Sequence, residues 1–204
     1  MRIWIVLFLA LTSVNAHADK NGFYTGAGVG ITDLKVAFNA TPNGTYDIDD
    51  KTLDVQFFVG YHIGNHWSVE GGYTYFGEND ADNLLYLENP FLGTPFNLEI
   101  EVNGYYLNGQ YHFQPSNDTS IDLMLGLIRG DATAKNTLCC GVLGSGTANG
   151  RVSEDELAPM VGIGLTKDMT EQWALRIHWN HYNLDLDNTI EAPWRIGLDL
   201  IWDF

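Results

Sequence analysis

The chain has 204 residues, with 26 Asp and Glu against 10 Lys and Arg, and 45% of its residues are hydrophobic. This length fits one domain. The acidic excess without any basic run excludes nucleic acid as a partner, because phosphate binding needs clustered Lys and Arg, and aromatic and branched residues spread along the chain exclude disorder.

The N-terminal segment has the pattern of a secretory signal peptide. Arg2 supplies a positive charge, residues 3–11 form an apolar run too short to span a bilayer, and Ala16 and Ala18 form a small-x-small cleavage site. A retained anchor helix is the less favoured alternative. We therefore expect residues 1–18 to be removed on export and residues 19–204 to form the mature domain.

From residue 23 onward, large apolar side chains alternate with small or polar ones. A period of two predicts β-strands with one apolar face. The expected strands are residues 23–32, 53–63, 67–76, 104–113, 121–128, 157–165, 173–180 and 194–204. Strands of about ten residues match the length needed to cross a bilayer at a tilt.

The connections between these strands alternate between short and long. Residues 64–66, 114–118 and 167–172 are short, whereas residues 33–50, 77–97 and 131–155 are long and polar. This parity favours an outer-membrane barrel over a soluble sandwich or lipocalin. The predicted fold is all-β, an eight-stranded antiparallel transmembrane β-barrel with short periplasmic turns and long extracellular loops.

Three segments resemble the OmpA-like eight-stranded outer-membrane β-barrels, including the small porin-family and OmpX/Ail-like members. They are GFYTGAGVG at 22–30, the hairpin from FVGYH at 58–62 to WSVEGGYTY at 67–75, and the terminal Phe204. The resemblance implies an integral protein of a Gram-negative outer membrane, whose Phe204 is an assembly signal read by the barrel-assembly machinery. The ending Trp-Asp-Phe departs from the more usual Tyr-Arg-Phe type, and the chain lacks the peptidoglycan-binding domain of larger OmpA proteins, so anchoring to the cell wall is not implied.

The inside of an eight-stranded barrel is filled by side chains rather than open. Glu70 and Arg176 each lie three residues into a strand from a periplasmic turn, so we expect them to pair across the axis, with Asp199 joining them. Asp54 and Arg195 are expected to form a second layer. This lumen polar network is either a static core or a switchable gate, as the resemblance suggests. The remaining polar residues expected to face inward are Asp122, His62, His112, His178, Asn108 and Gln110.

An enzymatic role is not expected. The stretch at 178–183, followed by Glu191, is similar to the motif of lipid A deacylases, which places a Ser two residues after the His. Asn183 occupies that position, so His181 has no hydroxyl to activate. We do not expect Ser68, Ser120 or Ser153 to lie near His181.

The long connections carry three further features. Cys139 and Cys140 are adjacent and cannot join distant parts of the chain, so they are interpreted as loop residues, with a vicinal disulfide, a metal site or an intermolecular bridge as alternatives. The acidic stretch at 78–83 lacks the Gly and closing Glu of a calcium loop. We interpret the acidic stretch as solvated by water. The alternative is that its carboxylates bind divalent ions shared with lipopolysaccharide. The apolar cluster at 84–87 with residues 91 and 92 suits contact with a partner or lipid, or folding of the loop on itself.

The sequence thus predicts a structural or surface-interaction protein of the outer membrane without cofactor or metal. A narrow gated channel for ions or small solutes is the first alternative, and a lipopolysaccharide-modifying enzyme is the second. The expected partners are outer-membrane lipid, lipopolysaccharide and the assembly machinery. A surface ligand would bind the loops at 33–50, 77–97 and 131–155.

Overall fold

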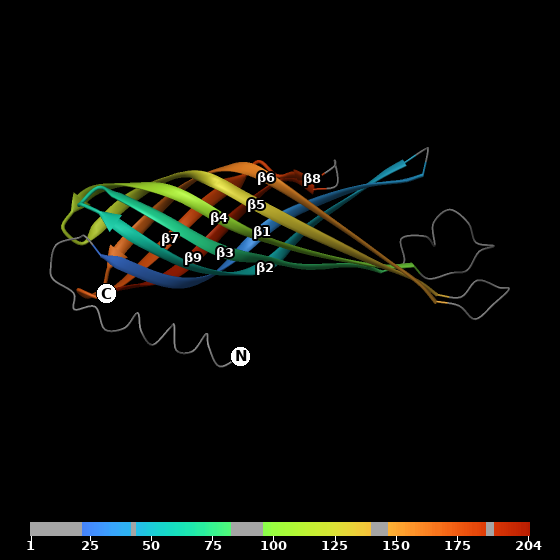
Figure 1. The fold of residues 1–204 in the computed structure, drawn as a ribbon, viewed down its shortest axis with the longest axis horizontal. Helices are drawn as coiled ribbons and strands as arrows, with labels where there is room; N and C mark the ends of the chain where they lie inside the picture. Colours follow the sequence, from blue (N-terminus) through green and yellow to red (C-terminus); the bar gives the residue numbers. More distant parts are fainter. Residues whose placement is uncertain (1–21, 42–43, 83–95, 140–146, 187–189) are drawn as a thin grey trace.

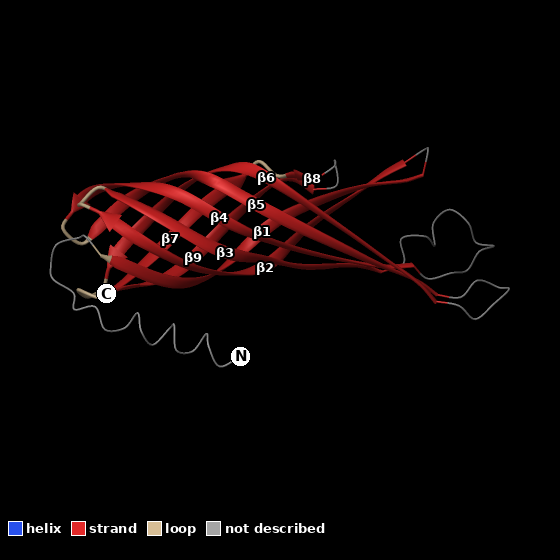
Figure 2. Cartoon of the chain, viewed as in Figure 1, coloured by secondary structure: helices blue, strands red, loops and turns tan. Residues whose placement is uncertain are grey.

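The computed structural model describes residues 22–41, 44–82, 96–139, 147–186 and 190–204. All regular secondary structure in these residues is β-strand (Figures 1 and 2). The strands are β1 (Phe23–Thr41), β2 (Gly44–Ile63), β3 (Trp67–Asp82), β4 (Phe96–Ser116), β5 (Thr119–Cys139), β6 (Thr147–Asp168), β7 (Trp173–Tyr182), β8 (Asp185–Leu186) and β9 (Ile190–Asp203).

The strands form one antiparallel sheet that closes on itself. Each strand from β1 to β7 pairs with the next, β7 pairs with β9, and β9 pairs with β1, from Tyr24 opposite Asp203 to Val36 opposite Ile190. The two-residue β8 pairs with β9 beyond the end of β7, so β7 and β8 are two segments of one wall strand. In the described residues, eight strands therefore form the barrel wall, which confirms the predicted fold class. Within the described ranges, closure pairs both edges of each of these strands over the belt.

The period-two alternation of the sequence separates the two faces of the wall. Outward side chains are large, apolar and exposed, as for Leu53 at 81% and Leu125 at 68%, whereas their inward neighbours Asp54 and Met124 are buried. Because these outward residues form a continuous apolar belt, they suit contact with lipid rather than water.

Aromatic pairs mark the edges of the apolar belt. Near the short turns, Trp67 packs edge-on against Tyr111, and Trp173 stacks on Trp202 with ring centroids 5.8 Å apart. Further along β3, Tyr73 lies 5.1 Å from Tyr105. Aromatic rings at both ends of a belt are typical of barrels that meet two membrane interfaces.

Three short turns and the C-terminus lie at one end of the barrel, drawn on the left of Figure 1. Residues 64–66 join β2 to β3, with Gly64 at φ 67°, a left-handed conformation that glycine adopts without strain. Residues 117–118 join β4 to β5, and residues 169–172 join β6 to β7. By the arrangement usual for such barrels, this is the periplasmic end.

The boundaries predicted for the long loops are wrong. Much of 33–50, 77–97 and 131–155 is strand, because the strands continue beyond the belt at the opposite end (Figure 2). There β1 stays paired with β2, and β3 to β6 stay paired in sequence order. Outside the belt the alternation of apolar and polar residues is incomplete: it persists in FNLEIEV at 96–102 but is lost in TAKNTL at 133–138. Backbone pairing continues without that alternation, and a period-two pattern therefore ends too early.

One bulge accompanies the passage of β3 out of the belt. The register of β3 with β4 shifts between Tyr75 and Gly77, and Gly77 has φ 104°. A side chain there would be strained, and its Cβ would lie 2.8 Å from Thr52 Cβ.

Some sequence-based expectations lie outside the described residues. These are the signal peptide at 1–18, the apolar cluster at 84–92 and Cys140. Cys139 is the last residue of β5, and residues 78–82 belong to β3. In the described part of the chain, no helix is long and apolar enough to cross a membrane.

Candidate functional site

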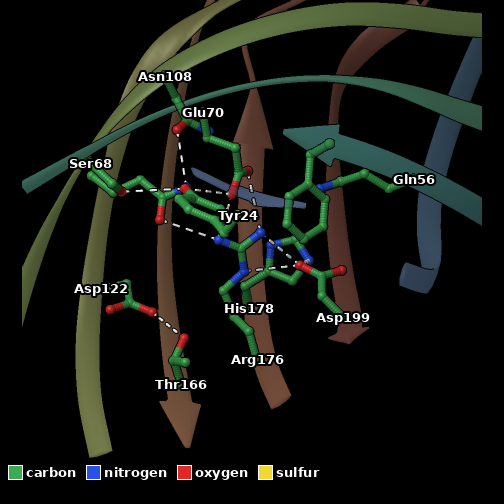
Figure 3. Close-up of polar contacts among 12 residues, drawn as sticks. Tyr24, Gln56, Ser68, Glu70, Asn108, Asp122, Thr166, Arg176, His178 and Asp199 are labelled. Carbon is green, nitrogen blue, oxygen red and sulfur yellow. Dashed lines mark hydrogen bonds and ion pairs between the residues drawn. The ribbon is translucent and has the colours of Figure 1, made fainter. Parts of the chain in front are cut away.

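The lumen near the periplasmic end holds a buried charged cluster, drawn in Figure 3. The Arg176 guanidinium of β7 lies between Glu70 of β3 and Asp199 of β9. Its Nη1 donates to Glu70 Oε2 at 2.9 Å, and its Nε donates to Asp199 Oδ2 at 2.9 Å. All three residues are at most 1% exposed. The structure thus brings together the three residues that the depth count from the turns placed at one level.

Neutral donors and acceptors surround Glu70 and Arg176. Tyr24 and Tyr106 donate hydroxyl protons to the two oxygens of Glu70, at 3.1 and 2.9 Å. Gln110 accepts from Arg176 Nη1 at 3.2 Å, and the guanidinium carbon lies 4.7 Å from the centre of the Phe58 ring. Both tyrosines lie on the inward face, but no pattern in the sequence predicts their contact with Glu70.

A second layer lies further from the turns. Arg195 Nε donates to Asp54 Oδ1 at 2.6 Å, and Thr32 donates to Asp54 Oδ2 at 2.9 Å. Arg195 Nη1 lies 2.6 Å from His178 Nε2, so that ring nitrogen accepts and the imidazole is neutral. The same nitrogen is 3.4 Å from Asp199 Oδ2, so the two layers lie in direct contact.

Beyond the charged layers, the lumen is filled by apolar side chains. Phe76 and Tyr182 pack edge-on with ring centroids 5.3 Å apart, and both are fully buried. The other buried members of this apolar layer are Val102, Ile128, Ala158, Met160 and Leu184. Sequence reasoning missed this layer as a unit, although Phe76, Ile128 and Met160 fall at inward positions of the predicted strands. Charged and apolar layers together fill the lumen.

The periplasmic mouth contains the remaining inward histidines. His62 Nε2 lies 3.2 Å from Asp203 Oδ1, and His112 Nδ1 lies 2.7 Å from Asp122 Oδ1. His112 Nε2 is also 2.9 Å from the hydroxyl of Ser68. Sequence reasoning placed these histidines inward but did not pair them with Ser68.

His181 lies apart from this lumen network. Its ring stacks on Trp179 at an interplanar angle of 4°, and the backbone amide of Asn183 donates to the Pro159 carbonyl at 3.0 Å. Within the described ranges, no cluster of three or more His, Cys, Asp or Glu side chains could hold a metal ion.

Phe204 follows β9 at the periplasmic rim. Its backbone amide donates to the Phe23 carbonyl at 3.1 Å, and its ring lies 4.8 Å from the ring of Trp202. The C-terminal residue is therefore attached to the seam between β1 and β9, where the barrel closes.

Comparison with solved structures shows the same fold in several outer-membrane barrels. OprG of Pseudomonas aeruginosa is 15% identical with a TM-score of 0.61, and the alignment covers 91% of this chain and 97% of that chain. Neisserial surface protein A is 17% identical with a TM-score of 0.51, covering 90% and 97%. Ail of Yersinia pestis, in complex with the heparin analogue sucrose octasulfate, is 16% identical with a TM-score of 0.51, covering 88% and 99%.

A search of curated proteins found no match. The sequence model of the outer membrane protein β-barrel domain matches residues 4–199, almost the whole chain. Together with the closed eight-stranded barrel and its outward apolar belt, this match establishes an integral protein of the outer membrane. The chain belongs to the outer membrane protein β-barrel domain family.

Proposed function

We propose that the protein is a sealed barrel that anchors in the outer membrane and carries its long hairpins to the cell surface. The observation that supports this role most strongly is the filling of the lumen. Two connected layers of buried ion pairs, centred on Arg176 and Arg195, lie beneath an apolar layer around Phe76 and Tyr182. Water and ions need a continuous polar path, and the apolar layer interrupts it.

The alternative is a narrow channel gated by the Glu70–Arg176 pair. Conductance of refolded protein in a planar lipid bilayer distinguishes the two functions. A sealed barrel gives no current steps above those of protein-free bilayers. Regular steps from the wild type would contradict the proposal and favour the channel.

The hairpins are the part of the protein available to a surface ligand. The segments 33–50, 77–97 and 131–155 each contain more Asp and Glu than Lys and Arg. Such segments repel polyanions, so the ligand we propose is cationic or is bridged by divalent ions shared with lipopolysaccharide. Binding of an anionic polysaccharide to purified barrel without divalent ions would contradict this charge argument.

We also propose that Phe204 acts as the assembly signal. The Phe204 amide adds a backbone hydrogen bond to β1 at the closing seam. Deleting Phe204 should lower the amount of protein in the outer membrane, whereas Asp203→Asn, which alters only a partly exposed contact with His62, should have a smaller effect. Equal membrane levels of the deletion variant and the wild type would contradict this role.

The lipopolysaccharide-modifying alternative receives no support from His181. Its ring is stacked on Trp179, and the position two residues further carries an amide side chain instead of a hydroxyl. We therefore propose that the outward surface around His181 contacts lipid and does not catalyse a reaction on it. The role of the barrel as a membrane scaffold needs no catalytic group.

A further inference from the structure

Three residues on consecutive strands form a hydrogen-bonded chain near the periplasmic mouth. Ser68 of β3 lies with its Oγ 2.9 Å from His112 Nε2 of β4, and His112 Nδ1 lies 2.7 Å from Asp122 Oδ1 of β5. We propose that Ser68 is a nucleophile activated by His112 and Asp122, and that this site hydrolyses small carboxylic esters entering from the periplasm. The proposal goes beyond the scaffold role and departs from the expectation of no enzymatic chemistry.

The order of the contacts defines the role of each group. A carboxylate accepts only, so the Nδ1 that faces Asp122 carries the ring proton, and Nε2 is left to accept the Ser68 hydroxyl proton. This is the connectivity by which serine hydrolases activate their nucleophile on unrelated folds. The site is thus recognised from geometry rather than from a sequence motif.

The carboxylate is held in place by further donors. Ser120 donates to Asp122 Oδ1 at 2.7 Å, and the Thr166 hydroxyl of β6 donates to Oδ2. The Asp122 side chain is 1% exposed, whereas that of His112 is 13% exposed. A buried, multiply bonded carboxylate fixes the imidazole, and the partly exposed imidazole lines the cavity at the periplasmic end.

Access comes from a cavity of about 470 Å³ at the periplasmic end. Its wall includes His112, Ser120, Thr166 and Tyr24. Ser68 is 1% exposed and lies behind Tyr24, whose hydroxyl is 3.3 Å from Ser68 Oγ. Entry of a substrate therefore requires the Tyr24 ring to turn aside, which breaks its hydrogen bond to Glu70 and restricts the substrate to a compact acyl group.

The reaction balances without any co-reactant other than water. Ser68 Oγ bonds to the ester carbonyl carbon while its proton passes to His112 Nε2. The bond between that carbon and the alkoxy oxygen then breaks, and the proton leaves with the alcohol. Water, deprotonated by the same nitrogen, attacks the acyl-serine, releases the carboxylic acid and restores the Ser68 hydroxyl.

The test is covalent labelling of refolded barrel with phenylmethylsulfonyl fluoride, followed by intact mass and peptide mapping. We expect one label per chain, on Ser68, and none in Ser68→Ala. His112→Gln should slow labelling by about 100-fold, because a positioned general base contributes roughly that factor or more. The wild type should hydrolyse p-nitrophenyl acetate faster than Ser68→Ala, and His112→Gln should hydrolyse it no faster than Ser68→Ala.

Ser116→Ala is the matched control, because Ser116 lines the same cavity but donates its hydroxyl proton to Asp118. Its labelling at Ser68 should equal that of the wild type. Each variant is first shown to be folded by different migration of boiled and unboiled samples on an SDS gel. The proposal is overturned if folded wild type gains no label on Ser68, or if His112→Gln labels as fast as the wild type.

Discussion

Replacing Arg176 by Met is the sharpest perturbation of the lumen. Arg176 is the cation between two buried carboxylates, at 2.9 Å from Glu70 and 2.9 Å from Asp199. Methionine fills similar space without charge, so both carboxylates lose their counter-ion. Removing one partner of a buried ion pair typically costs about 3 to 5 kcal/mol. We expect Arg176→Met to lower the free energy of unfolding by an amount in this range.

Loss of Arg176 should destabilise the two buried carboxylates to different extents. After the substitution, Glu70 keeps hydrogen bonds from Tyr24 and Tyr106. Asp199 is left facing His178 Nε2 at 3.4 Å, a nitrogen that accepts from Arg195 and has no proton to donate. Neutralising Asp199 should therefore recover more stability than neutralising Glu70. The triple variant with Glu70→Gln, Asp199→Asn and Arg176→Met should be closest to the wild type.

Urea unfolding of the barrel refolded in lipid vesicles measures these differences, with tryptophan fluorescence as the signal. Residues in direct contact show coupling of about 0.5 to 3 kcal/mol in a double-mutant cycle. Additive effects of Glu70→Gln and Arg176→Met would refute the contact across the axis. If Glu70→Gln recovered more of the free energy of unfolding than Asp199→Asn, the conclusion that Tyr24 and Tyr106 stabilise the Glu70 carboxylate would be refuted.

Three further substitutions test the barrel wall and one of the turns. A Cβ at Gly28 would lie 1.9 Å from Asp199 Oδ1, so Gly28→Ala should destabilise the barrel in urea, whereas Gly71→Ala, whose nearest neighbour is 3.6 Å away, should unfold like the wild type. In the exposed turn, the Lys167 ammonium 2.8 Å from Asp118 is the largest cause that holds the pKa of that carboxyl well below its usual range. Lys167→Met should raise this pKa toward about 3.9, as measured by carboxyl NMR. Since the folded-state pKa is lowered, the contact stabilises the protein at pH values above the unfolded pKa, and this contribution is lost as the pH falls; an unchanged titration would contradict the pairing.

Much of the barrel could be predicted because a membrane wall imposes a strict period of two. Every second residue of the last strand, from Ile196 to Leu200, faces outward, while Arg195 and Asp199 are buried. The depth of a residue could also be counted from its turn, because short turns fix where each strand begins. That count placed Glu70 and Arg176 at one level, where the structure has them.

Other features depend on geometry that one strand does not encode. The ion pair between Arg176 and Glu70 joins strands far apart in the sequence, and its tyrosine donors depend on side-chain length and on glycines that leave room in the lumen. The contact of Ser68 with His112 is diagonal across β3 and β4, since Ser68 is opposite Gln110 in the ladder. Such contacts depend on the stagger of the closed barrel, which a pattern of alternation does not specify.

Closure between β1 and β9 is the central claim, because the sealed lumen and the lipid-facing belt both depend on it. In the structure, Ala27 is opposite Leu200 and Val29 is opposite Leu198. NMR of uniformly labelled protein refolded in detergent micelles tests this directly. We expect nuclear Overhauser contacts between the backbones of these pairs, together with slow amide exchange along both strands. Fast-exchanging β1 amides without any contact to β9 would contradict a closed barrel.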